Sequence, residues 1–209
     1  MQYRASPTAT SVLVLDLDET LIHTVFPYAG AAQSGLPAPH YRYANSMGGY
    51  LRPGLRQFLA FAQRSFTHVG VWTAASPDYA QFIVDQVLRP LGFAPKFLLT
   101  GTDCEWVPYR QGNAMVRVKP LRKLWTQPRF RWLGANEQNT LIVDDRPETA
   151  QLNPRQLVAL RPFSPTTTLH DAELTNVQQR LAVWLASRQQ SRPLAASGAR
   201  PYRPQLRSF

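Results

Sequence analysis

Apolar and polar positions along the chain follow two alternating patterns. Short continuous apolar runs, typical of strands covered on both faces, lie at residues 11–15, 68–72, 139–143 and 156–160. Apolar residues at helical spacing predict amphipathic helices at residues 54–64, 76–88 and 171–188. Because strands alternate with helices, we expect an α/β fold with a central parallel sheet and helices on both of its faces.

Two segments fall outside this alternation. Residues 26–51 are rich in Ala, Gly, Pro, Tyr and Ser and are too long for an ordinary connection, so they are interpreted as a small insertion over the site or as a mobile loop. Residues 191–209 contain four arginines, three prolines and no acid, which predicts a disordered or loosely docked basic tail. The folded domain is accordingly expected to span residues 1–190.

Composition narrows the classes of protein further. With 44% hydrophobic residues the chain can bury a core, and no apolar run approaches the roughly 20 residues of a membrane helix. We therefore expect a cytoplasmic protein, or a nuclear one if the source is eukaryotic. The net charge of +10 favours anionic partners such as phosphorylated peptides or nucleic acid, bound through the basic surface or tail. Cys104, the single cysteine, excludes an internal disulfide, and the oligomeric state stays open.

Candidate chemistry begins at the end of the first predicted strand. Asp16 and Asp18 follow this strand directly, and the alternation of side chains along an extended backbone places both on the same side. Two carboxylates this close repel unless a cation lies between them, and Mg²⁺, which prefers oxygen ligands, is the natural counter-charge. Taken alone, an acidic turn that caps a helix explains the pair nearly as well.

Polar residues at other strand ends favour the chemical interpretation. Thr73 and Ala74 follow the second predicted strand, an acidic pair at 144 and 145 follows the third, and Lys119 lies on the loop before it. In open parallel sheets ligands bind where the carboxyl ends of the strands meet. Together these residues supply a nucleophile, an acid/base, a hydroxyl donor, a cation and a metal cage, which are the requirements of phosphoryl transfer.

The same residues carry a resemblance to a known family. The sequence resembles the haloacid-dehalogenase-like (HAD) phosphatases, whose pattern is Asp-x-Asp-x-Thr, then Thr or Ser, then Lys, then a pair of acids or Asp-Asn. Within that superfamily it resembles the branch of RNA polymerase II C-terminal-domain phosphatases and NLI-interacting-factor-like proteins. The matching stretches are residues 15–24, Arg52-Pro-Gly, residues 72–79 and residues 144–147. The resemblance implies a Rossmann-like HAD fold with a small insertion after the first motif.

The resemblance also implies roles for individual residues. Asp16 is expected to be the nucleophile that becomes an aspartyl-phosphate. Asp18 is expected to protonate the leaving oxygen and then activate water, while its backbone carbonyl contacts Mg²⁺. The residues expected to bind substrate are Thr20, Thr73, Ala74, Tyr79 and Lys119, with Thr73 and Lys119 on the phosphoryl oxygens. The expected metal ligands are Asp16, Asp18, Asp144 and Asp145.

The substrate is less well specified than the chemistry. Small polymerase-tail phosphatases place an arginine near the segment 97–104 to hold the peptide, and this segment contains none. Tyr79 matches a position that lines the substrate cleft, but its helical spacing with Phe82 and Ile83 fits a core residue equally. The favoured interpretation is a Mg²⁺-dependent phosphoserine/phosphothreonine protein phosphatase. The alternatives are a phosphatase for small metabolites or polynucleotide 3′-phosphates, and a non-catalytic binding module, although such modules typically lose one motif aspartate.

Overall fold

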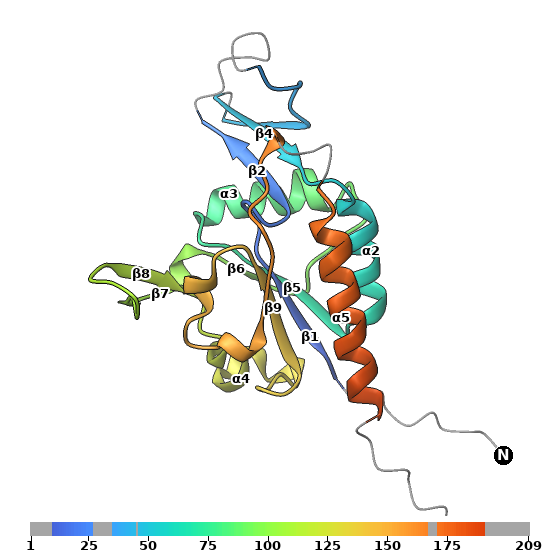
Figure 1. The fold of residues 1–209 in the computed structure, drawn as a ribbon, viewed down its shortest axis with the longest axis vertical. Coiled ribbons are helices and arrows are strands. Elements are labelled where there is room, and N and C mark those ends of the chain that lie inside the picture. Colours follow the sequence, from blue (N-terminus) through green and yellow to red (C-terminus); the bar gives the residue numbers. More distant parts are fainter. Residues whose placement is uncertain (1–9, 27–34, 45, 167–170, 191–209) are drawn as a thin grey trace, which may run out of the picture.

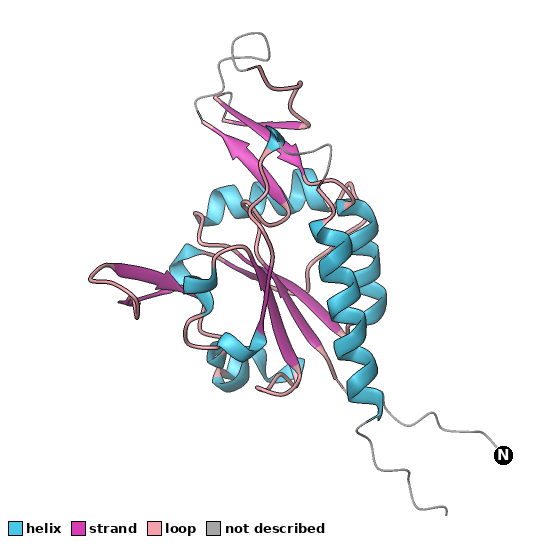
Figure 2. Cartoon of the chain, in the orientation of Figure 1, coloured by secondary structure: helices cyan, strands magenta, loops and turns pink. Residues whose placement is uncertain are grey.

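The computed structural model describes residues 10–26, 35–44, 46–166 and 171–190. Its centre is a five-stranded sheet with the strand order β10-β9-β1-β5-β6, in which all neighbouring strands are parallel (Figure 2). The strands are β1 (Val12–Leu15), β5 (His68–Trp72), β6 (Leu98–Leu99), β9 (Thr140–Asp144) and β10 (Leu157–Ala159). The four strands predicted from apolar runs are confirmed, and the predicted α/β fold with them.

Both faces of the sheet are covered, which explains why β1 is apolar throughout. Leu13 and Leu15 face one layer, and Val12 and Val14 face the other, and all four are fully buried. The first layer contains α2 (Leu55–Ser65), α3 (Pro77–Phe82) with its continuation η1 (Ile83–Leu88), and α5 (Glu173–Gln190). The second contains α4 (Arg122–Thr126), η3 (Pro128–Leu133) and η4 (Pro147–Ala150). Figure 1 shows α2 and α5 side by side on one flank.

The three predicted helices are also confirmed, with bounds that differ by at most two residues. In the second one, Ser76 caps the helix by accepting a hydrogen bond from the backbone N–H of Tyr79 at 3.4 Å, and Pro77 occupies the first turn. The helix then widens from α geometry into a π-helix over Ile83–Leu88, which the apolar spacing did not predict.

The segment at residues 26–51 contributes to a second sheet. It is antiparallel, with the order β2-β4-β3, and it consists of β2 (Ile22–Val25), β3 (Tyr41–Tyr43) and β4 (Met47–Leu51). Gly49 is required in β4, because a Cβ atom there would overlap the Tyr41 ring at 2.0 Å. Of the two interpretations, the described part fits the small insertion; residues 27–34 and 45 lie outside the described residues.

A two-stranded ribbon projects from the body on the opposite flank from α2 and α5 (Figure 1). It consists of β7 (Glu105–Pro108) and β8 (Met115–Val118), which the sequence did not predict. Within the described part of the chain, no helix combines the length and apolar character needed to cross a membrane. The predicted basic tail at residues 191–209 lies outside the described residues.

Candidate active site

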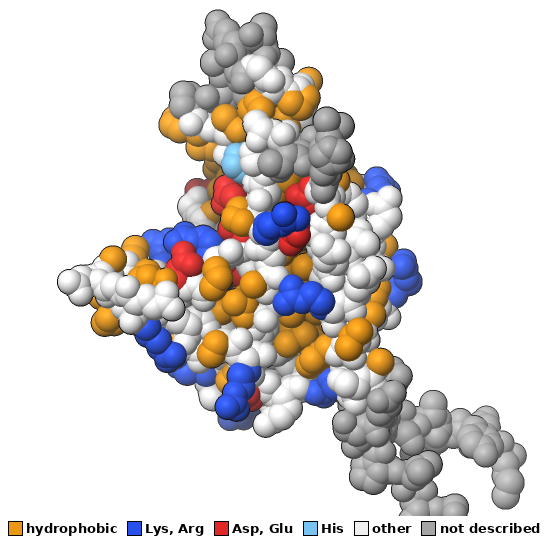
Figure 3. Space-filling view, in the orientation of Figure 1, with side chains coloured by type: hydrophobic (Ala, Val, Ile, Leu, Met, Phe, Trp, Pro, Cys, Tyr) orange, Lys and Arg blue, Asp and Glu red, His pale blue; other side chains and the backbone are white. Residues whose placement is uncertain are grey.

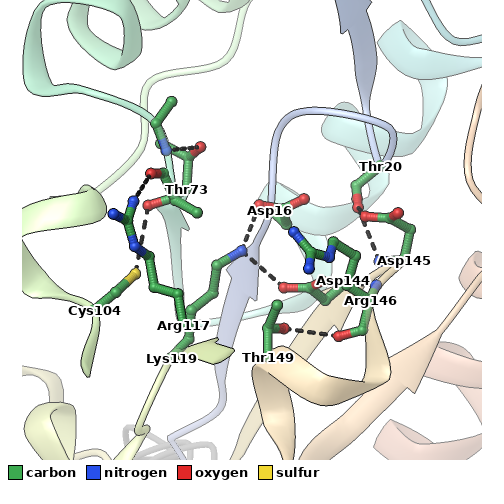
Figure 4. Close-up of polar contacts among 12 residues, drawn as sticks. Asp16, Thr20, Thr73, Cys104, Arg117, Lys119, Asp144, Asp145, Arg146 and Thr149 are labelled. Carbon is green, nitrogen blue, oxygen red and sulfur yellow. Dashed lines mark hydrogen bonds and ion pairs between the residues drawn. The ribbon is translucent and has the colours of Figure 1, made fainter. Parts of the chain in front are cut away.

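Several predicted site residues converge at the carboxyl edge of the central sheet (Figure 4). Asp16 follows β1, Thr73 follows β5, Asp144 ends β9, and Lys119 follows β8. They line a cavity of about 240 Å³ whose wall consists of Asp16, Asp18, Glu19, Thr73, Ala74, Ala75, Lys119, Asp144, Arg146 and Thr149. The cavity thus lies where open parallel sheets bind ligands.

The Lys119 ammonium lies between two carboxylates at the floor of this cavity. Its Nζ donates to Asp16 Oδ1 and, at 2.7 Å, to Asp144 Oδ2, and all three side chains are buried. Burial raises the pKa of Asp16 to about 8, and the nearby Lys119 opposes that rise. Burial alone would lower the pKa of Lys119, but Asp16 and Asp144 raise it above its usual range. Lys119 is therefore a permanent cation beside Asp16.

Three carboxylates form a cluster that could hold a metal ion. Asp16, Asp144 and Asp145 each offer an oxygen, and these oxygens lie within 4.8 Å of one another. The pKa of Asp145 is raised to about 6, first by burial and then by the charge of Asp144. One ammonium cannot neutralise three buried carboxylates, and such a set of hard oxygen ligands fits Mg²⁺. The Asp18 carboxylate is not part of this cluster, so only its backbone carbonyl stays a predicted ligand.

Thr20 was expected to bind substrate, but it does not line the cavity. Its side chain is fully buried, its Oγ1 donates to Asp145 Oδ1 at 3.2 Å, and the backbone N–H of Asp145 donates to the same Oγ1 at 3.1 Å. Because both hydrogen bonds go to one residue, Thr20 orients Asp145 within the carboxylate cluster.

Tyr79 does not line the cavity either, because its hydroxyl is engaged elsewhere. It donates to Asp18 Oδ1 at 2.6 Å and lies 2.6 Å from the Thr24 hydroxyl of β2. Burial raises the pKa of Asp18, and the Tyr79 hydrogen bond opposes that rise. Tyr79 is also buried, with its ring 5.2 Å from that of Tyr43 between centroids. It therefore belongs to the core and at the same time holds the Asp18 carboxylate.

Arg52 fixes the loop that carries Asp16 and Asp18. Its guanidinium is fully buried, pairs with Asp171 at 2.9 Å, and donates to the carbonyl oxygens of Thr20 at 3.0 Å and Arg161 at 2.7 Å. It also donates to the carbonyl of Glu19, whose φ of 57° is a left-handed conformation that costs a non-glycine residue free energy. Arg52 thus stabilises a strained turn at the cavity rim.

Three functional candidates escaped the sequence reasoning. Arg146, directly before η4, and Thr149, within it, line the cavity, and only the Asp-Asp-Arg-Pro stretch hinted at the first. Arg117 of β8 donates from Nη1 to the carbonyl oxygen of Ala74 at 2.7 Å and lies against Gly101. An arginine therefore does reach the segment 97–104, but it comes from a strand distant in sequence, where no local pattern marks it.

Comparison with known proteins agrees with this geometry. The family described as NLI interacting factor-like phosphatase matches residues 11–192. The chain belongs to this family. Together with its CTD phosphatase-like relatives, this membership makes the chain an HAD-type phosphatase of the C-terminal-domain (CTD) phosphatase branch.

Individual relatives share much of this family domain. A CTD phosphatase-like protein of Invertebrate iridescent virus 6 is 29% identical over 161 residues, which cover 72% of this chain and 85% of the viral protein. The ubiquitin-like domain-containing CTD phosphatase 1 of Drosophila melanogaster is 28% identical over 158 residues, or 73% of this chain and 41% of the fly protein. The solved structure of Fcp1, an essential RNA polymerase II CTD phosphatase, has the same fold at a TM-score of 0.53 and 17% identity, covering 87% of this chain. The chain spans 53% of that Fcp1 structure.

Proposed function

We propose that this phosphatase hydrolyses phosphoserine or phosphothreonine in proteins, with Mg²⁺ and through an aspartyl-phosphate on Asp16. The observation that carries the proposal is the buried ammonium of Lys119 between Asp16 and Asp144, at the floor of a cavity open to substrate. A fixed cation at this point favours the ionised, nucleophilic form of Asp16 against the effect of burial, and it attracts a phosphoryl dianion.

The residues divide the reaction into two displacements. In the first, an Asp16 oxygen attacks phosphorus, the bond to the leaving oxygen breaks, and Asp18 donates its proton to that oxygen. In the second, the Asp18 carboxylate takes a proton from water as the water attacks phosphorus, which releases inorganic phosphate and regenerates Asp16. The raised pKa of Asp18 supports the first step, because a buried carboxylic acid keeps its proton to higher pH than an exposed aspartate does.

Other side chains bind and orient the phosphoryl group. Thr73 and Lys119 both line the cavity beside Asp16, which fits donation from the hydroxyl and the ammonium to phosphoryl oxygens (Figure 4). Mg²⁺, when held by Asp16, Asp144 and Asp145, would neutralise part of the phosphoryl charge and draw one of its oxygens toward the nucleophile. Thr20 keeps Asp145 in place for this purpose.

A protein substrate is favoured over the alternatives by the relatives. Both the viral and the fly relative carry CTD phosphatase in their names, and Fcp1 is described as acting on RNA polymerase II. The net charge of +10 also suits a polynucleotide, but four of the arginines that contribute to it lie in residues 191–209, outside the described residues. We therefore treat polynucleotide 3′-phosphates and small phosphorylated metabolites as the competing substrates.

Hydrolysis of p-nitrophenyl phosphate by the wild type and by Asp16→Asn, each with Mg²⁺ and with EDTA, tests the chemistry. Of these four samples, we expect activity only in the wild type with Mg²⁺. A panel of phosphoserine peptides, nucleotides and 3′-phosphorylated oligonucleotides then tests the substrate class, and a higher kcat/KM for peptides is expected. If Asp16→Asn with Mg²⁺ were as active as the wild type, Asp16 would not be the nucleophile. A higher kcat/KM for oligonucleotides than for peptides would contradict a protein substrate.

A further inference from the structure

The β7–β8 ribbon has one face turned to the body and one turned to solvent. In its antiparallel register Trp106 lies opposite Arg117, and Pro108 opposite Met115. Because side chains alternate along each strand, these four share one face. The other face carries Val118, which is fully buried, and Glu105, which forms ion pairs with residues of α4.

The outer face is apolar and exposed. Trp106 is 60% and Met115 53% exposed, and Pro108 is exposed beside them. The guanidinium carbon of Arg117 lies 4.9 Å from the centroid of the Trp106 ring, which holds the ring in place. Apolar side chains are visible on the projecting ribbon in Figure 3. Single exposed apolar residues are common, but adjacent ones on opposite strands form a patch that suits a partner.

This face is continuous with the catalytic cavity. Arg117 stacks on Trp106 and at the same time donates to the carbonyl oxygen of Ala74, a residue of the cavity wall. A chain bound with its phosphoryl group at Asp16 can therefore pass over Arg117 onto the ribbon. Within the described part of the chain, neither β7 nor β8 pairs with a third strand, and the ribbon is joined to the body by contacts of β8 with η4 and of Glu105 with α4.

The chemistry of the face favours polypeptide over nucleic acid. A single-stranded nucleic acid needs cations along its path for its phosphates as well as rings for its bases. Here Arg117 is the one cation among the four residues of the outer face, and its Nη1 is already bound to Ala74. Pro108 and Met115 offer apolar surface without a donor side chain, which suits the apolar side chains of an extended peptide.

We propose that the outer face of the ribbon, formed by Trp106, Pro108, Met115 and Arg117, binds an apolar or aromatic side chain that flanks the phosphorylated residue of a protein substrate. This inference rests on the proposed function. It adds a site of substrate selection, so that substrates with apolar residues beside the phosphoserine are favoured over polar ones.

Kinetics with a matched pair of phosphoserine peptides test this inference. One peptide carries Leu and Tyr on both sides of the phosphoserine, and the other carries Gly and Ser there. We expect Trp106→Ala to lower kcat/KM for the apolar peptide about tenfold, mainly through KM, and Met115→Ser to lower it about threefold, since truncation of a buried aromatic anchor costs more than 1 kcal/mol. Hydrolysis of p-nitrophenyl phosphate, which is too small to reach the ribbon, should stay within about twofold of the wild type.

Trp132→Ala is the matched control, because Trp132 is 53% exposed but packs on His68, at the amino end of β5 and away from the cavity. The inference is overturned if Trp106→Ala and Trp132→Ala have the same effect, or if peptide and p-nitrophenyl phosphate activities fall together.

Binding of the same peptides to Asp16→Asn, measured by fluorescence anisotropy, separates this inference from the proposed function. If wild-type catalysis fails, the ribbon inference still stands when the apolar peptide binds more tightly than the polar one and Trp106→Ala in this background removes the difference. Equal binding of the two peptides overturns it. So does Trp106-dependent binding of a 3′-phosphorylated oligonucleotide alone, or a decrease in sedimentation mass on Trp106→Ala, which would show the face to be a contact between copies of the chain.

Discussion

Replacement of Arg52 by methionine is expected to destabilise the protein by about 3–5 kcal/mol, the usual cost of removing one partner of a buried ion pair. Arg52 is 1% exposed, and its loss leaves Asp171, whose side chain is 5% exposed, without its counter-charge. The carbonyl oxygens of Thr20 and Arg161 lose a donor at the same time. Urea unfolding followed by tryptophan fluorescence measures the change in the free energy of unfolding.

Arg161→Met is the matched control for this prediction. Arg161 forms an ion pair at 2.9 Å with Glu173, which lies two residues after Asp171 in the sequence. The Arg161 side chain, however, is 79% exposed. Exposed ion pairs contribute about 0–1 kcal/mol, so this variant should unfold almost as the wild type does. Because Arg52 also holds the strained Glu19 turn, we expect Arg52→Met to lose kcat even where it is fully folded. Equal stability of the two variants would refute the role assigned to Arg52.

Three further predictions concern the carboxylates and their partners. Lys119→Met should lower kcat/KM about 10²–10³-fold while Lys96→Met leaves it unchanged, and similar rates for the two would remove Lys119 from the phosphoryl site. The pKa values of Asp16 and Asp145 are raised from 3.8 to about 8 and about 6 in the metal-free protein, so the folded state binds protons more tightly than the unfolded chain does. The free energy of unfolding should therefore fall as the pH rises from 3.8 through these two values. Mg²⁺ binds the ionised forms, so its stabilisation in thermal melts should be larger at pH 8 than at pH 6, and an equal shift at both would contradict the cluster. Tyr79→Phe removes the hydrogen bond that lowers the pKa of Asp18, so the alkaline limb of the pH–kcat/KM profile for phosphopeptides should move to higher pH; an unmoved limb would separate Tyr79 from Asp18.

The sequence predicted the central sheet because burial on both faces leaves a local pattern. Val12 and Leu13 face opposite layers and are both apolar, so β1 appears as a continuous run. The β7–β8 ribbon leaves no such pattern: β7 reads Glu-Trp-Val-Pro and exposes its Trp, and β8 includes Arg117 among apolar residues. β6 has two residues, which is too short for any periodicity.

The candidate site was predictable where its residues follow strands directly. Asp16 and Asp144 are set by the ends of β1 and β9, so their convergence follows from parallel topology. The hydrogen-bond partners of Thr20 and Tyr79 could not be predicted from the sequence, because they depend on which distant side chain lies beside each hydroxyl in the fold. Arg117 reaches Ala74 across 43 positions of sequence for the same reason.

The most direct test of the account is the chemical identification of the phosphorylated residue. Borohydride reduces an aspartyl-phosphate to homoserine, so reduction after rapid quenching of the enzyme with Mg²⁺ and substrate, followed by peptide mass spectrometry, locates the acceptor. The account predicts homoserine at position 16 in the wild type, and none in Asp16→Asn or in the absence of substrate. Continued turnover of substrate with position 16 unmodified, or with Asp16→Asn as active as the wild type, would contradict it.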